Sequence, residues 1–167
     1  MGTRSNPADW PTDFAIGPMS TQDAEAMSHW HYEGAWRVYD LHGRTPAALD
    51  AYRSVKARSG DGDLLGFFCT GEEARVPGIA SSEGTLDLGW GMNPAWAGRG
   101  HGHSFGAAIL DEIRQLHGSN RIRAVVQSWN KRSIRVLNKL GFTGSAIHTC
   151  IQNDIPVQYD ILVRTPT

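Results

Sequence analysis

The sequence has few of the features that mark secreted, membrane-bound or nucleic-acid-binding proteins. It contains only two cysteines, Cys69 and Cys150, which are too few for a disulfide framework and lack the CxxC spacing of a metal site. No apolar run approaches the roughly 20 residues of a membrane-spanning helix, and the first ten residues have no apolar core of a secretory signal. The formal net charge is only −1, which provides no bulk attraction to nucleic acid or anionic lipid. We therefore expect a cytoplasmic protein without a membrane or nucleic-acid partner, whose cysteines are packing thiols.

The composition is that of a single globular domain. The chain has 167 residues, of which 40% are hydrophobic and 20% are charged, so it can bury a sizeable core but has little room for a second one. We find neither an internal repeat nor a low-complexity linker. The sequence is therefore expected to form a single domain, residues 1–167, with residues 1–11 as a flexible N-terminal extension, in a monomer or a homodimer.

Strands and helices are expected to alternate in the order β-α-α-β-β-β-α-β-α-β-β. The periodicity of apolar residues and the turn signals between them carry this prediction. The expected strands are 14–19, 64–70, 74–80, 85–92 and 122–129, with two more at 145–151 and 155–163, and the expected helices are 20–30, 45–58, 102–116 and 130–140. The predicted fold class is α/β, with a mixed sheet flanked by helices on both faces.

The most informative segment is a glycine-rich turn between an expected strand and an expected helix. Gly98, Gly100 and Gly102 alternate there, and an amphipathic helix follows at once. Backbone N–H groups without neighbouring Cβ atoms can converge on a phosphate oxygen, and the start of the helix adds a partial positive charge. Arg99 offers a charge-assisted contact to the same anion. The dinucleotide pattern GxGxxG and the P-loop pattern both fail on these residues. The alternative interpretation is a plain strand-to-helix turn that uses glycine for close packing.

This turn and the later segment NKRSIRVLNKLGF together resemble the GNAT superfamily of N-acetyltransferases over most of the chain. The family's Q/R-x-x-G-x-G/A loop matches residues 97–102, with Ala97 in place of the usual Gln or Arg. Its Asn-x-x-Ala/Ser…Gly-Phe block matches Asn130, Ser133, Gly141 and Phe142.

The resemblance implies a GNAT-like fold with a mostly antiparallel central sheet, acetyl-CoA as the co-substrate and no metal. It also implies that the cofactor passes between the strand ending at Met92 and the strand ending at Trp129, which would splay apart. The implied cofactor-binding residues are Met92, Ala97, Gly98, Arg99, Gly100, His101, Gly102, Asn130 and Ser133.

The chemistry at the acceptor requires a neutral amine. An ammonium group of pKa near 10 is only about one part in a thousand neutral at pH 7, so a proton acceptor assists. The family often places an acidic residue on the strand before the glycine-rich turn, and Asp87 is the only carboxylate of 85–92. The resemblance thus implies Asp87 as the base, acting through water, with a structural Asp as the alternative. The tyrosine that commonly protonates the leaving thiolate would stand at position 137, which is Leu137.

The segment His29–Asp40 is rich in aromatic residues and contains two carboxylates. In the family this region usually lines the acceptor site, and an aromatic wall suits a cationic amine with an apolar body. The predicted substrate-binding residues are Trp30, Tyr32, Glu33 and Trp36. Helix core plus surface is the alternative. The His-x-His pairs at 29/31 and 101/103 have no ligand partner at matching spacing, so no metal site is expected.

The predicted function is therefore transfer of an acetyl group from acetyl-CoA to a primary amine of a small molecule by direct attack. Two alternatives stay open at this point. One is acetylation of a protein at a lysine or at the N-terminus. The other is a regulatory module that binds acyl-CoA without turnover. This alternative stays open because Leu137 stands where the family commonly has a tyrosine.

Overall fold

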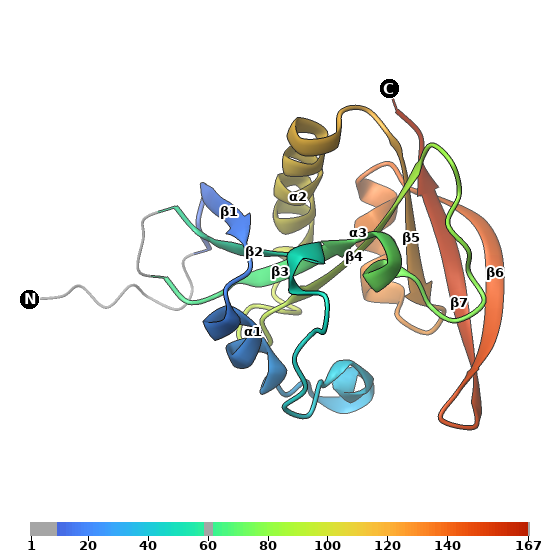
Figure 1. The fold of residues 1–167 in the computed structure, drawn as a ribbon, viewed down its shortest axis with the longest axis horizontal. Helices are drawn as coiled ribbons and strands as arrows, with labels where there is room; N and C mark the ends of the chain where they lie inside the picture. The colour runs from blue at the N-terminus through green and yellow to red at the C-terminus, as the bar shows by residue number, and fades with distance from the viewer. Residues whose placement is uncertain (1–9, 59–61, 167) are drawn as a thin grey trace, which may run out of the picture.

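The computed structural model describes residues 10–58 and 62–166, which form one seven-stranded sheet of order β1-β2-β3-β4-β5-β7-β6 (Figure 1). The strands are β1 Phe14–Pro18, β2 Tyr52–Ala57, β3 Gly66–Thr70, β4 Thr85–Met92, β5 Arg121–Gln127, β6 Thr143–Gln152 and β7 Ile155–Arg164. The α-helices are α1 Thr21–Ser28, α2 Gly102–His117 and α3 Lys131–Lys139, and three short 3-10 helices are η1 Gly34–Tyr39, η2 Leu49–Ala51 and η3 Gly71–Ala74. All neighbouring strands are antiparallel except β4 and β5. The expectation of a mixed, mostly antiparallel sheet is confirmed.

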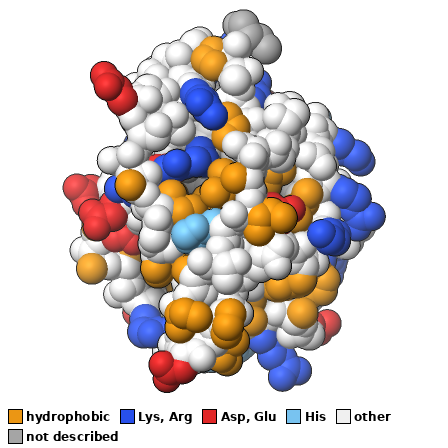
Figure 2. Space-filling view, turned by 90° about the vertical axis from the view of Figure 1, so that its right-hand side faces the viewer, with side chains coloured by type: hydrophobic (Ala, Val, Ile, Leu, Met, Phe, Trp, Pro, Cys, Tyr) orange, Lys and Arg blue, Asp and Glu red, His pale blue; other side chains and the backbone are white. Residues whose placement is uncertain are grey.

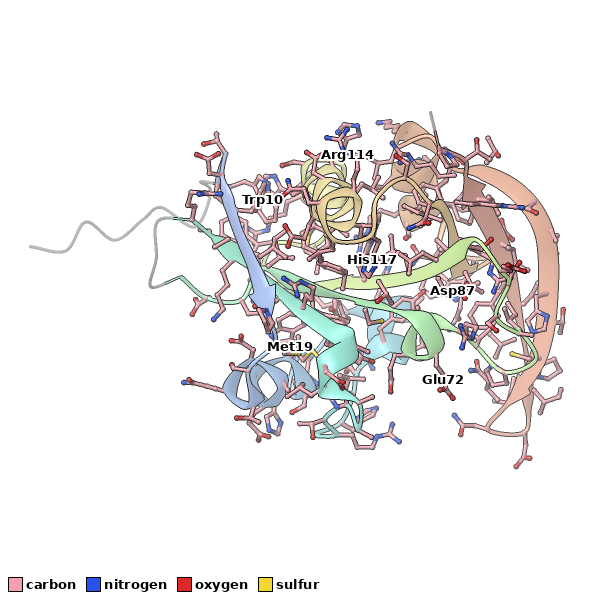
Figure 3. The ribbon with its side chains drawn as sticks, turned by 45° about the horizontal axis from the view of Figure 1, so that its top comes forward. Trp10, Met19, Glu72, Asp87, Arg114 and His117 are labelled. Carbon is pink, nitrogen blue, oxygen red and sulfur yellow. The ribbon has the colours of Figure 1, made fainter. Side chains whose placement is uncertain are left out.

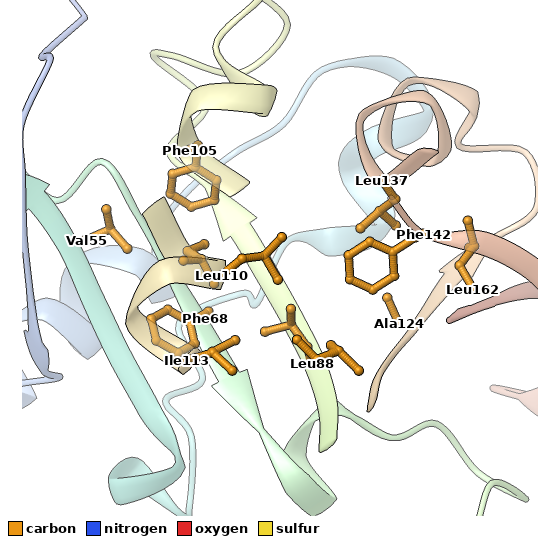
Figure 4. Close-up of a cluster of buried hydrophobic side chains, with 12 residues drawn as sticks. Val55, Phe68, Leu88, Phe105, Leu110, Ile113, Ala124, Leu137, Phe142 and Leu162 are labelled. Carbon is orange, nitrogen blue, oxygen red and sulfur yellow. The ribbon is translucent and has the colours of Figure 1, made fainter. Parts of the chain in front are cut away.

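Helices cover both faces of the sheet, as expected (Figure 1). On one face, α2 and α3 enclose the main core, in which Phe68, Phe105, Leu137 and Phe142 are almost completely buried (Figure 4). On the other face, α1 covers a smaller cluster that contains Met27. The sheet therefore lies between the main core and the smaller cluster, and an opening between its strands connects its two faces.

The helix starts that the sequence predicts at Ser20 and Asn130 are confirmed. The Ser20 hydroxyl accepts a hydrogen bond from the N–H of Asp23 at 3.0 Å, and the Asn130 side chain accepts one from the N–H of Ser133 at 3.2 Å. Each of these bonds satisfies a backbone donor that the first turn of a helix leaves free. The residues that cap a helix can be recognised from local sequence for this reason.

Two expected elements are wrong. The predicted helix at 45–58 is instead η2 followed by β2, which lies between β1 and β3. Leu49, Tyr52 and Val55 have helical spacing, but Val55 is fully buried as part of a strand with neighbours on both sides because tertiary pairing overrides a short local pattern. The predicted strand at 74–80 is the end of η3 and an irregular segment, in which Gly78 has a φ of +89°.

The only parallel pairing of the sheet is short. β4 and β5 pair from Thr85–Leu88 to Arg121–Ala124, that is, over four register positions. Beyond these residues β4 remains paired with β3 as far as Met92, and β5 remains paired with β7 as far as Gln127. The two strands therefore diverge after Leu88 and Ala124, as the family resemblance implies.

Candidate active site

A cleft of about 1410 Å³ opens where β4 and β5 diverge. Residues 88–92 of β4 and 124–127 of β5 form its two sides. The cleft extends to the glycine-rich turn, α3 and η1, and also to β2, β3 and η3. The cleft thus connects the two faces of the sheet.

The glycine-rich turn forms one end of the cleft. Gly98 and Gly100 have φ angles of +74° and +85°, a left-handed conformation that is costly for any residue with a Cβ. Gly102 begins α2, and a Cβ there would lie 2.8 Å from Cγ2 of Val136 on α3. The residue before α2, His101, makes no side-chain cap, so the first N–H groups of this helix are available to an anion. The shape and the donors of this turn fit a diphosphate.

The structure divides the predicted cofactor residues into two groups. Seven of them line the cleft: Met92, Ala97, Gly98, Gly100, Gly102, Asn130 and Ser133. Arg99 and His101 are not among the lining residues. Arg99 is exposed to solvent, so its side chain remains a predicted rather than an observed part of the site.

His101 packs away from the cleft, against Trp10. The two rings are stacked with their centroids 4.6 Å apart and an interplanar angle of 7°, and the Trp10 indole N–H donates to the hydroxyl of Ser104 at 3.0 Å. Trp10 therefore packs against the outer side of the turn and the start of α2. Apart from Trp10 and Pro11, the expected flexible extension lies outside the described residues, and Trp10 itself is packed.

The face of α3 that borders the cleft is basic. Arg132, Arg135 and Lys139 all line the cleft, and their spacing of three and four residues places them on one side of the helix. The Arg132 guanidinium lies 4.3 Å from the centre of the Trp36 ring, and a Cβ on Gly98 would come within 2.5 Å of its Nη1 atom. Arg132 is thus beside the glycine-rich turn. Our sequence reasoning missed these cations, although their helical spacing was a usable signal.

Asn130 connects α3 to η1. Asn130 is 6% exposed. Its side-chain amide donates a hydrogen bond to the Tyr39 hydroxyl oxygen at 3.1 Å. Because Tyr39 accepts this bond, its own O–H hydrogen is free to be donated elsewhere. Burial raises the pKa of Tyr39 above its usual value, which keeps the hydroxyl protonated. Leu137, where the family has its common acid, is buried and also borders the cleft.

The other end of the cleft carries aromatic rings and carboxylates. The Phe67 ring lies 6.2 Å from that of Trp30 and 5.9 Å from that of Tyr52. The Tyr52 hydroxyl donates a hydrogen bond to Oε2 of Glu73 at 3.1 Å. Trp30, Tyr52, Phe67 and Glu73 all line the cleft. Only Trp30 of these four was predicted, because the others come from segments that sequence reasoning treated as core or turn.

The remaining predicted substrate residues have different surroundings. Tyr32 lines the cleft and donates its hydroxyl hydrogen to the carbonyl oxygen of Met92 at 2.6 Å, while Asp40 accepts its backbone N–H at 2.9 Å. Burial raises the pKa of Tyr32, and Asp40 adds to this effect. Trp36 lines the cleft beside Arg132. Glu33 is exposed and is not among the lining residues.

Asp87 lies below the point where the strands diverge, in an ion-pair network. Its side chain is 2% exposed, and it does not line the cleft. Arg123 of β5 contacts both carboxylate oxygens, at 2.6 and 3.1 Å, and Arg75 contacts Oδ2 at 3.1 Å. Two guanidinium groups thus contact the carboxylate of Asp87, which is labelled in Figure 3. This arrangement argues for a structural role and against the predicted role of Asp87 as the proton acceptor.

Cys69 lies beside the carboxylate end of the cleft. It is 5% exposed, and burial raises the pKa of its thiol to about 12, so the thiol is not a nucleophile at neutral pH. Within residues 10–58 and 62–166 no group of three His, Cys, Asp or Glu side chains could hold a metal ion. In the same part of the chain no helix has the length and apolar character needed to cross a membrane.

Residues 13–143 match the family model of the acetyltransferase (GNAT) domain. The chain belongs to the GNAT acetyltransferase family. This family uses acetyl-CoA as its co-substrate. The membership confirms the resemblance that residues 97–102 and the block from Asn130 to Phe142 suggested.

Known relatives agree with this assignment. The chain is 30% identical over 131 residues to the mycothiol acetyltransferase of Salinispora tropica, an alignment that covers 78% of this chain and 42% of that protein. The chain thus spans less than half the length of this curated relative. Among solved structures, it is similar to a GNAT-family acetyltransferase from Bacillus anthracis, with a TM-score of 0.68, 19% identity and coverage of 91% of this chain and 94% of the other. It is also similar to yncA, a putative acetyltransferase from Salmonella typhimurium solved with its cofactor acetyl-CoA, with a TM-score of 0.61, 18% identity and coverage of 91% and 93%.

Proposed function

We propose that this domain transfers the acetyl group of acetyl-CoA to a primary amine of a small cationic molecule by direct attack. The supporting observation is the charge distribution along the cleft. One part of the cleft presents the N–H groups of the glycine-rich turn and the cations of α3, while the part lined by Tyr52 and Phe67 presents the exposed carboxylate of Glu73. On the outer face shown in Figure 2, most acidic side chains lie at the left edge and most basic side chains at the right edge. An anionic cofactor and a cationic acceptor would each meet opposite charge.

The cofactor end would act mainly by binding and orientation. The N–H groups after Gly98 and Gly100 would hold the diphosphate, with Arg132 as the nearest side-chain cation. Asn130 and the free edges of β4 and β5 would hold the pantetheine arm in the gap between the strands. When bound, acetyl-CoA supplies an activated thioester, so the domain needs no covalent nucleophile of its own.

The acceptor end would bind an amine and remove a proton from it. Aromatic faces attract an ammonium group and also cover apolar substituents, and Trp30, Tyr52 and Phe67 form such a surface. The carboxylates would favour the cationic form on entry. Attack by the neutral amine at the thioester carbonyl then follows through the opening between Gly89 and Val125, which both line the cleft.

Assays of coenzyme A release from acetyl-CoA test this proposal. The amines to compare are phenethylamine, spermidine, glucosamine and a peptide with a free N-terminal alanine. We expect saturable release with at least one small amine. Release with the peptide alone would support protein acetylation instead. Coenzyme A binding by calorimetry without release for any amine would support a regulatory binding module, and absence of binding would contradict the cofactor site itself.

A further inference from the structure

Three residues on neighbouring strands lie in register next to the opening in the sheet. Tyr52 of β2 pairs with Cys69 of β3, and Cys69 pairs with Gly89 of β4. Gly89 is the first residue of β4 beyond the pairing with β5, so it borders the gap in which the thioester would lie. A Cβ on Gly89 would lie 3.3 Å from the sulfur of Cys69. Tyr52, Cys69 and Gly89 all line the cleft, so the cleft connects the Tyr52 side of the sheet to the gap.

Glu73 reaches this passage from η3. A Cβ on Gly89 would lie 3.7 Å from Cβ of Ala74, the next residue of η3. The Tyr52 hydroxyl holds one oxygen of the Glu73 carboxylate. Burial and the nearby Glu73 carboxylate both raise the pKa of Tyr52, so Tyr52 remains a neutral donor in this bond.

Glu73 and Asp40 are the two carboxylates that line the cleft within the described part of the chain, and they differ in availability. Asp40 is engaged on both oxygens, by the N–H of Tyr32 at 2.9 Å and by the ring of His31 at 3.3 Å, and its side chain is 7% exposed. Glu73 is exposed, and its Oε1 atom has no hydrogen-bond partner among the described residues. A ligand can therefore reach Glu73 but not Asp40.

We propose that Glu73 binds the ammonium group of the acceptor and takes its proton, with Tyr52 as a positioning residue and with the rings of Trp30, Tyr52 and Phe67 around the apolar part of the acceptor. This inference rests on the proposed function and identifies the acceptor class as a primary alkylamine with an apolar body. Tyr52 of β2 and Cys69 of β3 lie close to Glu73, and neither is cationic. Arg75 is on the same segment but is paired with Asp87.

The proton and electron balance is complete. The Glu73 carboxylate takes one proton from the ammonium group, and the nitrogen lone pair forms the C–N bond at the acetyl carbon. The C–S bond breaks, and its electron pair goes to sulfur. The second nitrogen proton neutralises the thiolate, directly or through water, and Glu73 releases its proton to solvent. The products are the amide, coenzyme A and one proton.

Glu73→Gln tests the proton transfer, and Glu72→Gln is its matched control. Glu72 is on the same 3-10 helix, is exposed, and does not line the cleft (Figure 3). With phenethylamine as the acceptor, we expect E73Q to lower kcat/KM by roughly 100-fold or more while the Kd of acetyl-CoA is unchanged. The residual rate should rise about tenfold per pH unit between pH 7 and 9, as the neutral fraction of the amine does. E72Q should behave as the wild type.

Two further measurements distinguish failure of this inference from failure of the proposed function. Calorimetry of phenethylammonium binding should show affinity for the wild type and at least about tenfold weaker binding to E73Q, whether or not turnover occurs. Tyr52→Phe should lower kcat about tenfold without changing the melting temperature or the KM of acetyl-CoA. If the amine binds with this difference but no coenzyme A is released, the proposed function fails and the ammonium site stands. If E73Q retains wild-type kcat/KM, pH dependence and amine affinity, the inference is overturned.

Discussion

The two ends of the cleft are built in different ways. The cofactor end consists mostly of backbone: a turn of three alternating glycines and the first N–H groups of α2, contiguous in sequence. The acceptor end consists of side chains from segments far apart in the chain, namely Trp30, Tyr52, Phe67 and Glu73. A site of backbone donors requires certain residues to have no side chain, which restricts the sequence and makes it recognisable. A site of side chains can be formed by many combinations of residues, so a local sequence pattern does not identify it.

The largest effect that we expect concerns the junction between the two ends. Asp87→Asn removes the charge that compensates Arg75 and Arg123, and loss of one partner from a buried ion pair costs about 3 kcal/mol. The melting temperature should therefore fall by about 6–12 °C. Thermal unfolding followed by circular dichroism measures this change.

Asp111→Asn is the control for that experiment. Asp111 pairs with Arg114 on the surface of α2, where both side chains are about 70% exposed, and such pairs contribute about 1 kcal/mol or less. An Asp87→Asn variant that keeps its melting temperature, loses activity at neutral pH and regains it at higher pH would instead support Asp87 as the proton acceptor.

A second prediction separates backbone geometry from ligand binding at the cofactor end. Gly100→Val should raise the Kd of coenzyme A by about 100-fold, because it removes about two charge-assisted hydrogen bonds from N–H groups to phosphate. Gly118→Val is the matched control. Gly118 also has a positive φ, +74°, with no atom near its Cβ position, but it ends α2 outside the cleft.

Both valine variants should lose stability because both place a β-branched residue at a positive φ. Only Gly100→Val should lose affinity in calorimetry. Equal affinity of the two variants for coenzyme A would contradict the assignment of the diphosphate to the glycine-rich turn.

A smaller effect is expected from the side chains that complete the cofactor end. Arg132→Gln should raise the Kd of coenzyme A about tenfold, since one charge-assisted contact is worth about 1.5 kcal/mol, and the salt dependence of the Kd should become weaker. Arg121→Gln, at the exposed start of β5 and outside the cleft, is the control. If both variants bind equally well, the cations of α3 do not contact the cofactor.

The sequence predicted those parts of the molecule that depend on local rules. The helix starts at Ser20 and Asn130 follow from capping, and the glycine-rich turn follows from residues 98–102. The divergence of β4 and β5 came from the family resemblance alone, since no residue pattern in the two strands indicates where their pairing ends. Local signals therefore predicted these two helix starts and the glycine-rich turn.

The rest depends on contacts between distant segments. Residues 52–57 have helical spacing but become a strand because β1 and β3 pair with them on both sides. The local sequence predicts Glu73 as a turn residue, and its hydrogen bond with Tyr52, 21 positions earlier, is seen only in the structure. Asp87 reads as a base until Arg123, 36 positions later, is found in contact with both of its oxygens. In each case the decisive partner is invisible to a local reading of the chain.

The short parallel pairing of β4 and β5 has a consequence for how this domain could change its substrates. It joins two antiparallel parts of the sheet, β1-β2-β3-β4 and β5-β7-β6. The two parts are paired at four register positions. Small rotations of one part against the other would alter the separation of the proposed cofactor and acceptor sites. Substitutions among the paired residues of β4 and β5 would therefore change the distance between the two reactants. Residues 85–87 and 121–123 would act in this way although they do not line the cleft.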